Sequence, residues 1–538
     1  MGVERRMVCA LLQTHSEDCK VATVNTVPYW QDAISLPMLH RLDRDIRVDV
    51  GIIGGGVAGI TSAYLLKAAG RTVALLDRDR LGSGDTGNTT AHLTAVTDTR
   101  LSELVNTFGR DHARAAWDAG FAAIAQIDEL VRAERISCGF EWVPTYLHTP
   151  ASWAHVEGDP AGEDDLRADA QLATELGFDA EFVDRVPFVD LPGVRFDGQA
   201  RIHPRAYLAG LVRRIEGDGS HVFERSPVED VIASPLALKA NGHTVTCDYV
   251  VVATHNPIGG KASLAAATLL QTKLALYSSY VVAGRVPHGH IPDALFVDTA
   301  DPYNYLRLDS GDQFDVAILG GEDHKTGQEP DTTGRFQRLQ EALIRAVPPV
   351  EVTHRWSGQV IETPDGLPYI GEIAARQFIA TGFAGNGMTF GTVAAMMARD
   401  AVQDVRNPWT DLFDPSRKKL TAGTVWDYLT ENKDYPYYLI RDRFAGAEGK
   451  SLRVLKRGEG RILDLDGERV AAYRAPDGSV AARSAVCTHM GCLVRWNPGE
   501  RTWDCPCHGS RFAPEGSVIS GPAESPLAEV SRRVPSAS

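Results

Sequence analysis

Residues 48–79, VDVGIIGGGVAGITSAYLLKAAGRTVALLDRD, carry the clearest indication of the fold of the first part of this chain. This stretch reads as a short apolar strand, a glycine-rich turn, a helix and a second strand that ends at Asp77. Gly54 permits the tight turn, Gly56 lets the backbone approach a pyrophosphate, and Gly59 lets the helix pack closely on the strand. Asp77 lies at the position where an acidic side chain accepts hydrogen bonds from the ribose hydroxyls of a dinucleotide. The stretch predicts a dinucleotide-binding βαβ unit.

Two further glycine-rich stretches extend this prediction. GSGDTGNTTAHLT, residues 82–94, suits a loop that meets phosphate, and QFIATGFAGNGMTFGTVAAMMARDAV, residues 377–402, reads as a strand, a glycine-rich loop and a helix whose N-terminus favours a polar cofactor edge. The second GxGxxG of the chain, at residues 82–87, lies within the loop just described and begins no new strand–helix unit, so a separate NAD(P)H domain is not expected. The candidate cofactor-binding residues are Gly54, Gly56, Gly59, Asp77, Arg78, Gly87, Asn88, Thr89, Thr90, Gly385, Asn386, Gly387, Met388 and Thr389.

The fingerprint, GDTGNTTA (84–91) and RWSGQVIETPDGLPYIG…GFAGNGMTFG (355–391) resemble the D-amino-acid-oxidase-type FAD-dependent oxidoreductases over about residues 46–405. The resemblance implies FAD across the first fingerprint and the late loop, and oxidation of amines or amino acids. Some members hold FAD covalently through Cys or His. Residues 356–365 contain no Cys and His92 is off the usual His position, so non-covalent FAD is expected. The implied FAD-binding parts are about 46–125, 201–260 and 351–405.

The resemblance also implies a mostly antiparallel substrate domain, from about 130–200 and 265–350. Within it, YNYLRLDSGDQFDVAILGGEDH, residues 303–324, reads as strand, turn and strand. Tyr305, Arg307 and His324 are the candidate catalytic residues, and Tyr303 is a further polar group that could face a substrate. The other interpretation of these side chains is surface or packing.

CTHMGC (487–492) and CPCHGS (505–510) hold four cysteines and two histidines. In each, one Cys and one His follow a fixed spacing: Cys487-x-His489 and Cys505-x-x-His508. Two thiolates and two imidazoles suit zinc or a Rieske [2Fe–2S] cluster. Zinc fingers pair their ligands as Cys-x-x-Cys and His-x₃₋₅-His, whereas the Rieske cluster has two Cys on one iron and two His on the other.

These boxes resemble Rieske domains of the cytochrome bc type, over about residues 436–535. The resemblance implies the metal ligands Cys487, His489, Cys505 and His508. It also implies a disulfide between Cys492 and Cys507, although two free thiols remain the alternative in a reducing compartment. Phe512 stands where the bc-type pattern has Tyr, so a donor to a cluster sulfur is missing and a lower potential is expected.

The length of the chain and the uneven distribution of its charge are consistent with several domains in one protein. The chain has 538 residues, 43% hydrophobic and 23% charged, and no apolar run long enough for a membrane helix. Its net charge of −15 argues against nucleic-acid binding. Residues 436–538 carry +3 and the rest −18, which would favour electrostatic docking of the tail domain. The predicted units are an N-terminal extension (1–45), the oxidoreductase (46–405), a linker (406–435) and the Rieske domain (436–538).

The expected fold is therefore α/β plus all-β: a Rossmann-like FAD-binding domain with an antiparallel substrate domain, then a small all-β Rieske domain. The expected function is an amine or amino-acid dehydrogenase that passes electrons from FAD through the cluster to a one-electron or quinone-like acceptor. Two alternatives stay open: a non-catalytic redox sensor or electron-transfer protein, and an oxygenase-associated reductase component. Scattered cysteines outside the cluster fit a reducing compartment, so a cytoplasmic location is expected.

Overall fold

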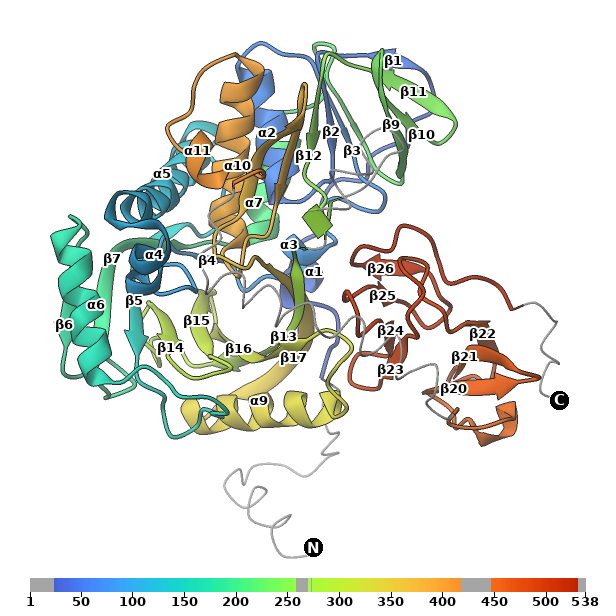
Figure 1. Ribbon diagram of the computed structural model, residues 1–538. Coiled ribbons are helices and arrows are strands. Elements are labelled where there is room, and N and C mark those ends of the chain that lie inside the picture. Colours follow the sequence, from blue (N-terminus) through green and yellow to red (C-terminus); the bar gives the residue numbers. More distant parts are fainter. Residues whose placement is uncertain (1–23, 258–269, 272, 418–446, 531–538) are drawn as a thin grey trace, which may run out of the picture.

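The computed structural model of the protein describes residues 24–257, 270–271, 273–417 and 447–530. The first 23 residues of the predicted extension, residues 418–435 of the predicted linker and both ends of the predicted tail domain lie outside these ranges. An α/β body forms most of the molecule, and a small group of antiparallel strands lies against one side of it (Figure 1). The expected fold class, α/β plus all-β, is confirmed.

A six-stranded sheet with the order β18-β19-β12-β2-β3-β8 carries the glycine fingerprint. β2 (Val50–Ile53) and β3 (Val73–Leu76) are buried along their whole length, as apolar strands covered on both faces must be. α2 (Val57–Ala68) joins them, and α10 (Gly387–Val402) begins beyond the same edge. Ligand sites form at this edge where the strand order reverses. The other strands are β8 (His221–Phe223), β12 (Tyr249–Val252), β18 (Tyr369–Ala374) and β19 (Gln377–Thr381).

A nine-stranded sheet with the path β17-β13-β16-β15-β14-β5-β7-β4 forms the second half of the body, and β6 pairs with β7. α9 (Thr332–Ala346) covers one face: Tyr280 packs on Phe336 with ring centroids 4.1 Å apart. The neighbouring Val281 belongs to the main core on the opposite face. The strands are β4 (His92–Leu93), β5 (Glu141–His148), β6 (Ala180–Val183), β7 (Gly193–Arg201), β13 (Ala275–Val286), β14 (Leu295–Asp298), β15 (Tyr305–Ser310), β16 (Asp315–Lys325) and β17 (Glu351–Glu362).

Residues just before the fingerprint pack on the body. α1 (Tyr29–Ala33) carries Trp30, which is fully buried and donates from Nε1 to the carbonyl of Thr89 at 2.6 Å. This part of the predicted extension thus supports the second glycine-rich stretch. The remaining elements of the body are α3 (Asp85–Asn88), α4 (Leu101–Phe108), α5 (Arg110–Glu134), α6 (Glu163–Glu175), α7 (Pro204–Val212), α11 (Thr410–Phe413), β1 (Ile46–Arg47), β9 (Val228–Ala233), β10 (Leu236–Ala240) and β11 (His243–Thr246).

The C-terminal strands form two small sheets, β20-β21-β22 and β23-β24-β25-β26. The second sheet lies nearer to the body (Figure 1). Trp503 and Phe512 are fully buried in the same core as Cys487, Cys492 and Cys505. No helix among the described residues is both long and apolar enough to span a bilayer. The strands are β20 (Glu459–Leu465), β21 (Glu468–Arg474), β22 (Val480–Ser484), β23 (Arg495–Asn497), β24 (Thr502–Asp504), β25 (Arg511–Phe512) and β26 (Val518–Ser520); Leu452–Val454 form a 3₁₀ turn.

Candidate functional site: two cofactor centres

The first glycine turn is a cradle that side chains would fill. Gly54 has φ of +104°, and a Cβ there would lie 2.4 Å from the carbonyl oxygen of Ala253. A Cβ on Gly59 would lie 1.8 Å from the carbonyl oxygen of Gly54, so the helix packs on the turn as the fingerprint requires. Gly56 caps α2, whose N-terminus offers donors and positive potential to phosphate. The geometry fits the pyrophosphate of a dinucleotide.

Asp77 is fixed at the end of β3 by backbone donors. Its carboxylate accepts from the N–H groups of Gly55 at 2.6 Å and Asp79 at 2.7 Å. Burial raises the pKa of this carboxyl group, and the two backbone bonds oppose that shift. Arg78 points the other way: it is exposed and donates to the carbonyl of Ile519 in the C-terminal domain. Asp77 therefore keeps its predicted place beside the cradle, whereas Arg78 touches the other domain.

Hydrogen bonds fix the loop of residues 82–90, here called the early loop, and the late loop of residues 382–389. The N–H of Gly82 donates to the carbonyl of Gly55 in the first glycine turn at 2.9 Å. In the early loop, a Cβ on Gly87 would lie 2.3 Å from the carbonyl oxygen of Gly82. In the late loop, Asn386 donates to the carbonyls of Thr94 and Val96, and Thr389 donates to Thr94. The remaining predicted binding residues lie in these two loops: Asn88, Thr89, Thr90, Gly385, Gly387 and Met388.

We expect acid or heat to release the flavin from the purified protein, because no covalent anchor is evident. His92 is the nearest candidate: its Nδ1 is 3.1 Å from the hydroxyl of Thr90, and its Nε2 has no hydrogen-bond partner among the described residues. Burial, with the nearby Arg307, lowers its pKa to about 3. Flavin absorbance in the supernatant after precipitation is the measurement. Flavin that stays with the precipitate would make His92 a tether.

A group of polar side chains lies on the face of the nine-stranded sheet that looks toward the late loop. Tyr303 donates to the carboxylate of Asp98 at 2.6 Å, and the hydroxyls of Tyr305 and Ser279 are 2.6 Å apart. A Cβ on Gly385 would lie 2.2 Å from the Asp98 carboxylate, so this acid directly abuts the late loop. The group therefore lies where a substrate would meet a flavin held by the loops.

Two carboxyl groups in this polar group have raised pKa values. Burial raises the pKa of Asp323 to about 7, although a hydrogen bond from Ser279 favours its ionised form. Burial also raises the pKa of Asp98 to about 6, against the hydrogen bond from Tyr303. The Asp98 side chain is exposed to solvent, although its carboxylate lies close to the backbone of Gly385. Paired, perturbed carboxyl groups of this kind mark candidate catalytic sites.

Only one of the three predicted catalytic residues, Tyr305, belongs to this polar group. Arg307 is 1% exposed and donates from Nη1 to the carbonyls of Thr90, Ala91 and Ile202 at 2.8–3.2 Å, so its guanidinium joins segments of the protein. His324 lies on the α9 side of the sheet, 5.3 Å from the ring of Tyr280. We do not retain Arg307 and His324 as substrate-facing candidates. Their place is taken by Asp98, Ser279 and Asp323, which the sequence alone did not single out.

The four predicted cluster ligands form two contacting pairs in the C-terminal domain, one of cysteines and one of histidines. Cys487 and Cys505 are both 2% exposed, and a thiol–thiol hydrogen bond lowers the pKa of Cys487 while it raises that of Cys505. The rings of His489 and His508 lie 4.9 Å apart at 89°. Burial lowers the pKa of both imidazoles, to about 4 for His508. Neutral imidazoles and an acidic thiol are what metal ligation needs.

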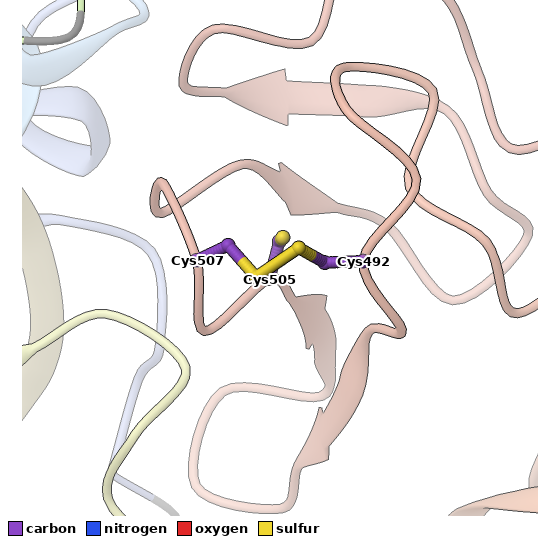
Figure 2. Close-up of side chains that lie close together, drawn as sticks. All are labelled: Cys492, Cys505 and Cys507. Carbon is purple, nitrogen blue, oxygen red and sulfur yellow. A yellow bond between two sulfur atoms is a disulfide. The ribbon is translucent and has the colours of Figure 1, made fainter. Parts of the chain in front are cut away.

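The donor set fits a Rieske cluster better than a three-cysteine site. Cys492, Cys505 and Cys507 approach one another closely (Figure 2). Cys492 and Cys507, however, are joined by a disulfide, so they are not available as thiolates. Nδ1 of His489 is buried and makes no hydrogen bond with the described residues, as expected of an atom that is a ligand. Two thiols and two imidazoles remain, which is the Rieske ligand set.

Phe512 is fully buried beside this site, and its ring brings no hydrogen-bond donor. Ser510 supplies one instead: its hydroxyl contacts the thiol of Cys487 and lowers that group's pKa. The same hydroxyl accepts from the N–H of Ala523 at 3.1 Å. One donor to a ligand sulfur is therefore present, and the potential stays a prediction.

Comparisons with known proteins identify two families along the chain. The model of the FAD dependent oxidoreductase family, DAO, matches residues 49–401, and that of the Rieske [2Fe-2S] domain matches residues 449–531. A Bacillus subtilis (strain 168) protein named as a Rieske 2Fe-2S iron-sulfur protein, YhfW, is 30% identical over 93% of this chain and 97% of its own.

Two relatives of the body carry enzyme names. The gamma-glutamylputrescine oxidoreductase of Escherichia coli (strain K12) is 23% identical over 75% of this chain and 94% of its own. The crystal structure of glycine oxidase from Geobacillus kaustophilus matches with a TM-score of 0.57 at 20% identity, over 69% of this chain and 99% of its own. The likeness to glycine oxidase concerns the fold.

Proposed function

The chain belongs to the FAD dependent oxidoreductase family and carries a Rieske [2Fe-2S] domain, and on this basis we propose that it is an amine or amino-acid dehydrogenase with a built-in electron relay. The predicted cofactors, FAD and a [2Fe–2S] cluster, are confirmed by these two families. The proposed route leads from substrate to FAD, then to the cluster, and then to a one-electron or quinone-like acceptor. Two relatives of the body are named for glycine and gamma-glutamylputrescine, and these names support an amine-type substrate.

One observation carries the proposal: the loop of residues 505–510, here called the cluster loop, packs directly on the body. A Cβ on Gly327 would lie 2.8 Å from the carbonyl carbon of Cys505. A Cβ on Gly509 would lie 2.6 Å from Cβ of Leu276 in β13. The loop that carries Cys505 and His508 thus packs beside the sheet that also bears the polar group. A domain that only happened to be tethered to the flavoprotein would not need its cluster loop at this contact.

The reaction must balance two electrons. Bound FAD would supply the acceptor for the hydride on the carbon next to nitrogen, and a bound [2Fe–2S] cluster would take one electron at a time. The C–H bond breaks, a C=N bond forms, the amine nitrogen loses a proton, and water then hydrolyses the imine. We propose that Asp323 receives the amine proton, since its pKa of about 7 suits a base near neutral pH. Asp98 and the two tyrosines, Tyr303 and Tyr305, would orient the amine.

The location and the excluded partners form part of the same proposal. Cys138 and Cys247 are buried free thiols, which fits a reducing compartment such as the cytoplasm. The net charge of −15 disfavours nucleic acid as a partner.

The relay is tested by anaerobic stopped-flow absorbance and low-temperature paramagnetic resonance on the intact protein, mixed with a panel of amines and amino acids. We expect flavin absorbance to fall first and the signal of the reduced cluster to follow within the same turnover. A flavin that turns over many times with the cluster still oxidised would contradict the relay and favour the redox-sensor alternative. Mononuclear iron in the purified protein would favour the oxygenase-associated alternative.

A further inference from the structure

A single strand separates the early loop from the cluster loop. On one face of β17, Trp356 donates from Nε1 to the carbonyl of Asn88 in the early loop at 2.6 Å. On the other face, Ser357 and Gln359 meet the C-terminal domain. Alternate residues of a strand point to opposite faces, so β17 presents one row to each loop. β17 therefore connects the early loop directly with the C-terminal domain.

Gln359 bonds to both sides of that connection. Its backbone N–H donates to the carboxylate of Asp85 in the early loop at 2.8 Å. Its side-chain Nε2 donates to the carbonyl of Gly509 in the cluster loop, also at 2.8 Å. The residue is 3% exposed, so the bond to the cluster loop is shielded from water. A buried carbonyl that loses its donor is costly, which makes this bond a strong determinant of docking.

The surroundings of Gln359 hold the same contact. Thr326 lies beside it, with its hydroxyl 3.4 Å from Nε2 of Gln359 and 3.0 Å from the hydroxyl of Ser278. Two residues further along the chain, Gln328 donates to the carbonyl of Pro506 at 3.0 Å. The side-chain amides of two glutamines therefore donate hydrogen bonds to two carbonyl groups of the cluster loop.

A buried ion cluster closes the interface at one end. Arg511 is 5% exposed and lies between Glu500, at 2.5 Å, and Asp504, at 3.3 Å. Ser357 of β17 hydrogen-bonds to both Glu500 and Arg511. A buried charged group is stable only when all its partners are in place. The ion cluster around Arg511 therefore favours one docked arrangement of the two parts.

We propose that Gln359 is a positioning residue for electron transfer: it fixes the cluster loop against the early loop, so that the relay operates in a docked state. This inference rests on the proposed function. The rate of electron transfer falls steeply as the separation of two centres grows, so a bond that fixes this separation controls the rate. The two electrons taken from each substrate molecule leave one at a time through the same contact.

The test compares Gln359→Met with the intact protein. Methionine keeps the length and approximate volume of the side chain but removes the donor to Gly509. We expect flavin reduction by substrate to stay within about twofold, and cluster reduction to slow by about tenfold, the effect of ~1.4 kcal/mol of lost docking free energy. Backbone amides of residues 505–510 should also exchange with deuterium faster in the oxidised protein, a readout independent of turnover.

Two further variants sharpen the result. Gln359→Asn keeps the amide but shortens the side chain by one methylene, so it should also slow reduction of the cluster. This variant keeps the test possible if Gln359→Met fails to fold. Gln313→Met makes the same chemical change at an exposed position in the turn between β15 and β16 and should change neither readout.

Two outcomes would overturn the inference. If both Gln359 variants reduce the cluster at the rate of the intact protein, with unchanged deuterium exchange, Gln359 does not position the loop although the relay exists. If the intact protein itself never reduces its cluster, the relay fails and the positioning role falls with it. The intact protein therefore separates the two failures.

Discussion

Cys487→Ser is expected to abolish the visible absorption and the paramagnetic resonance signal of the cluster, and to leave FAD bound. A serine hydroxyl is a far poorer iron ligand than a thiolate, and two Cys ligands hold one iron of a Rieske cluster. His508→Ala should have the same effect, because it removes one of the two imidazoles. The predicted FAD-binding residues lie in the body, whose core is separate, so flavin content should stay near one per chain. Iron and flavin analysis of the purified variants measures both.

Cys492→Ser provides the matched control, since it makes the same chemical change in the same loop. Cys492 is bonded to Cys507 and supplies no thiolate. This variant should retain a cluster that is less stable or shifted in potential, because the disulfide ties the two ligand-bearing loops together. If it loses iron as completely as Cys487→Ser, the division into ligands and disulfide is wrong.

The features that the sequence predicted well are local. The turn from Gly54 to Gly59 and the two Cys/His boxes each encode their geometry within a few residues, because φ, close approach and ligand spacing depend on immediate neighbours. The family models confirm both centres. The contact through Gln359 could not be predicted in this way, since it joins residues 150 positions apart in the chain.

Asp323, and not the predicted His324, belongs to the polar group, and this has a specific structural cause. Which residue of a strand faces a site follows from counting by two along it, and the count fails at an irregularity. β13 and β16 shift register between Ser278 and Tyr280, and Glu322 has φ of +59°. Sequence patterning does not reveal this shift. Arg307 illustrates a second limit: a buried arginine that donates to three carbonyls looks, in sequence, like one that binds substrate.

Asp323→Asn is expected to slow flavin reduction by about a hundredfold, near the lower limit for loss of a general base. Asparagine keeps the shape of the side chain but cannot take the amine proton. Asp312→Asn, the same change at an exposed turn of the same sheet, should have no effect. The measurement is the limiting rate of flavin bleaching at saturating substrate in the absence of oxygen. A rate that Asp323→Asn leaves unchanged would show that the amine loses its proton elsewhere.

The pH dependence gives an independent signature of Asp323. Burial raises its pKa to about 7, so the carboxyl group is protonated and inactive below that pH and ionised above it. The rate should therefore rise through about pH 7 and then level off, and Asp323→Asn should lose this limb. Burial raises the pKa of Asp98 to about 6. Asp98 interacts with Asp323 and should broaden the transition toward lower pH. The nearby Arg335 favours the ionised form of Asp323. If the limb at about pH 7 persists in Asp323→Asn but disappears in Asp98→Asn, the base is Asp98, and the hydrogen bond from Tyr303 then controls its ionisation.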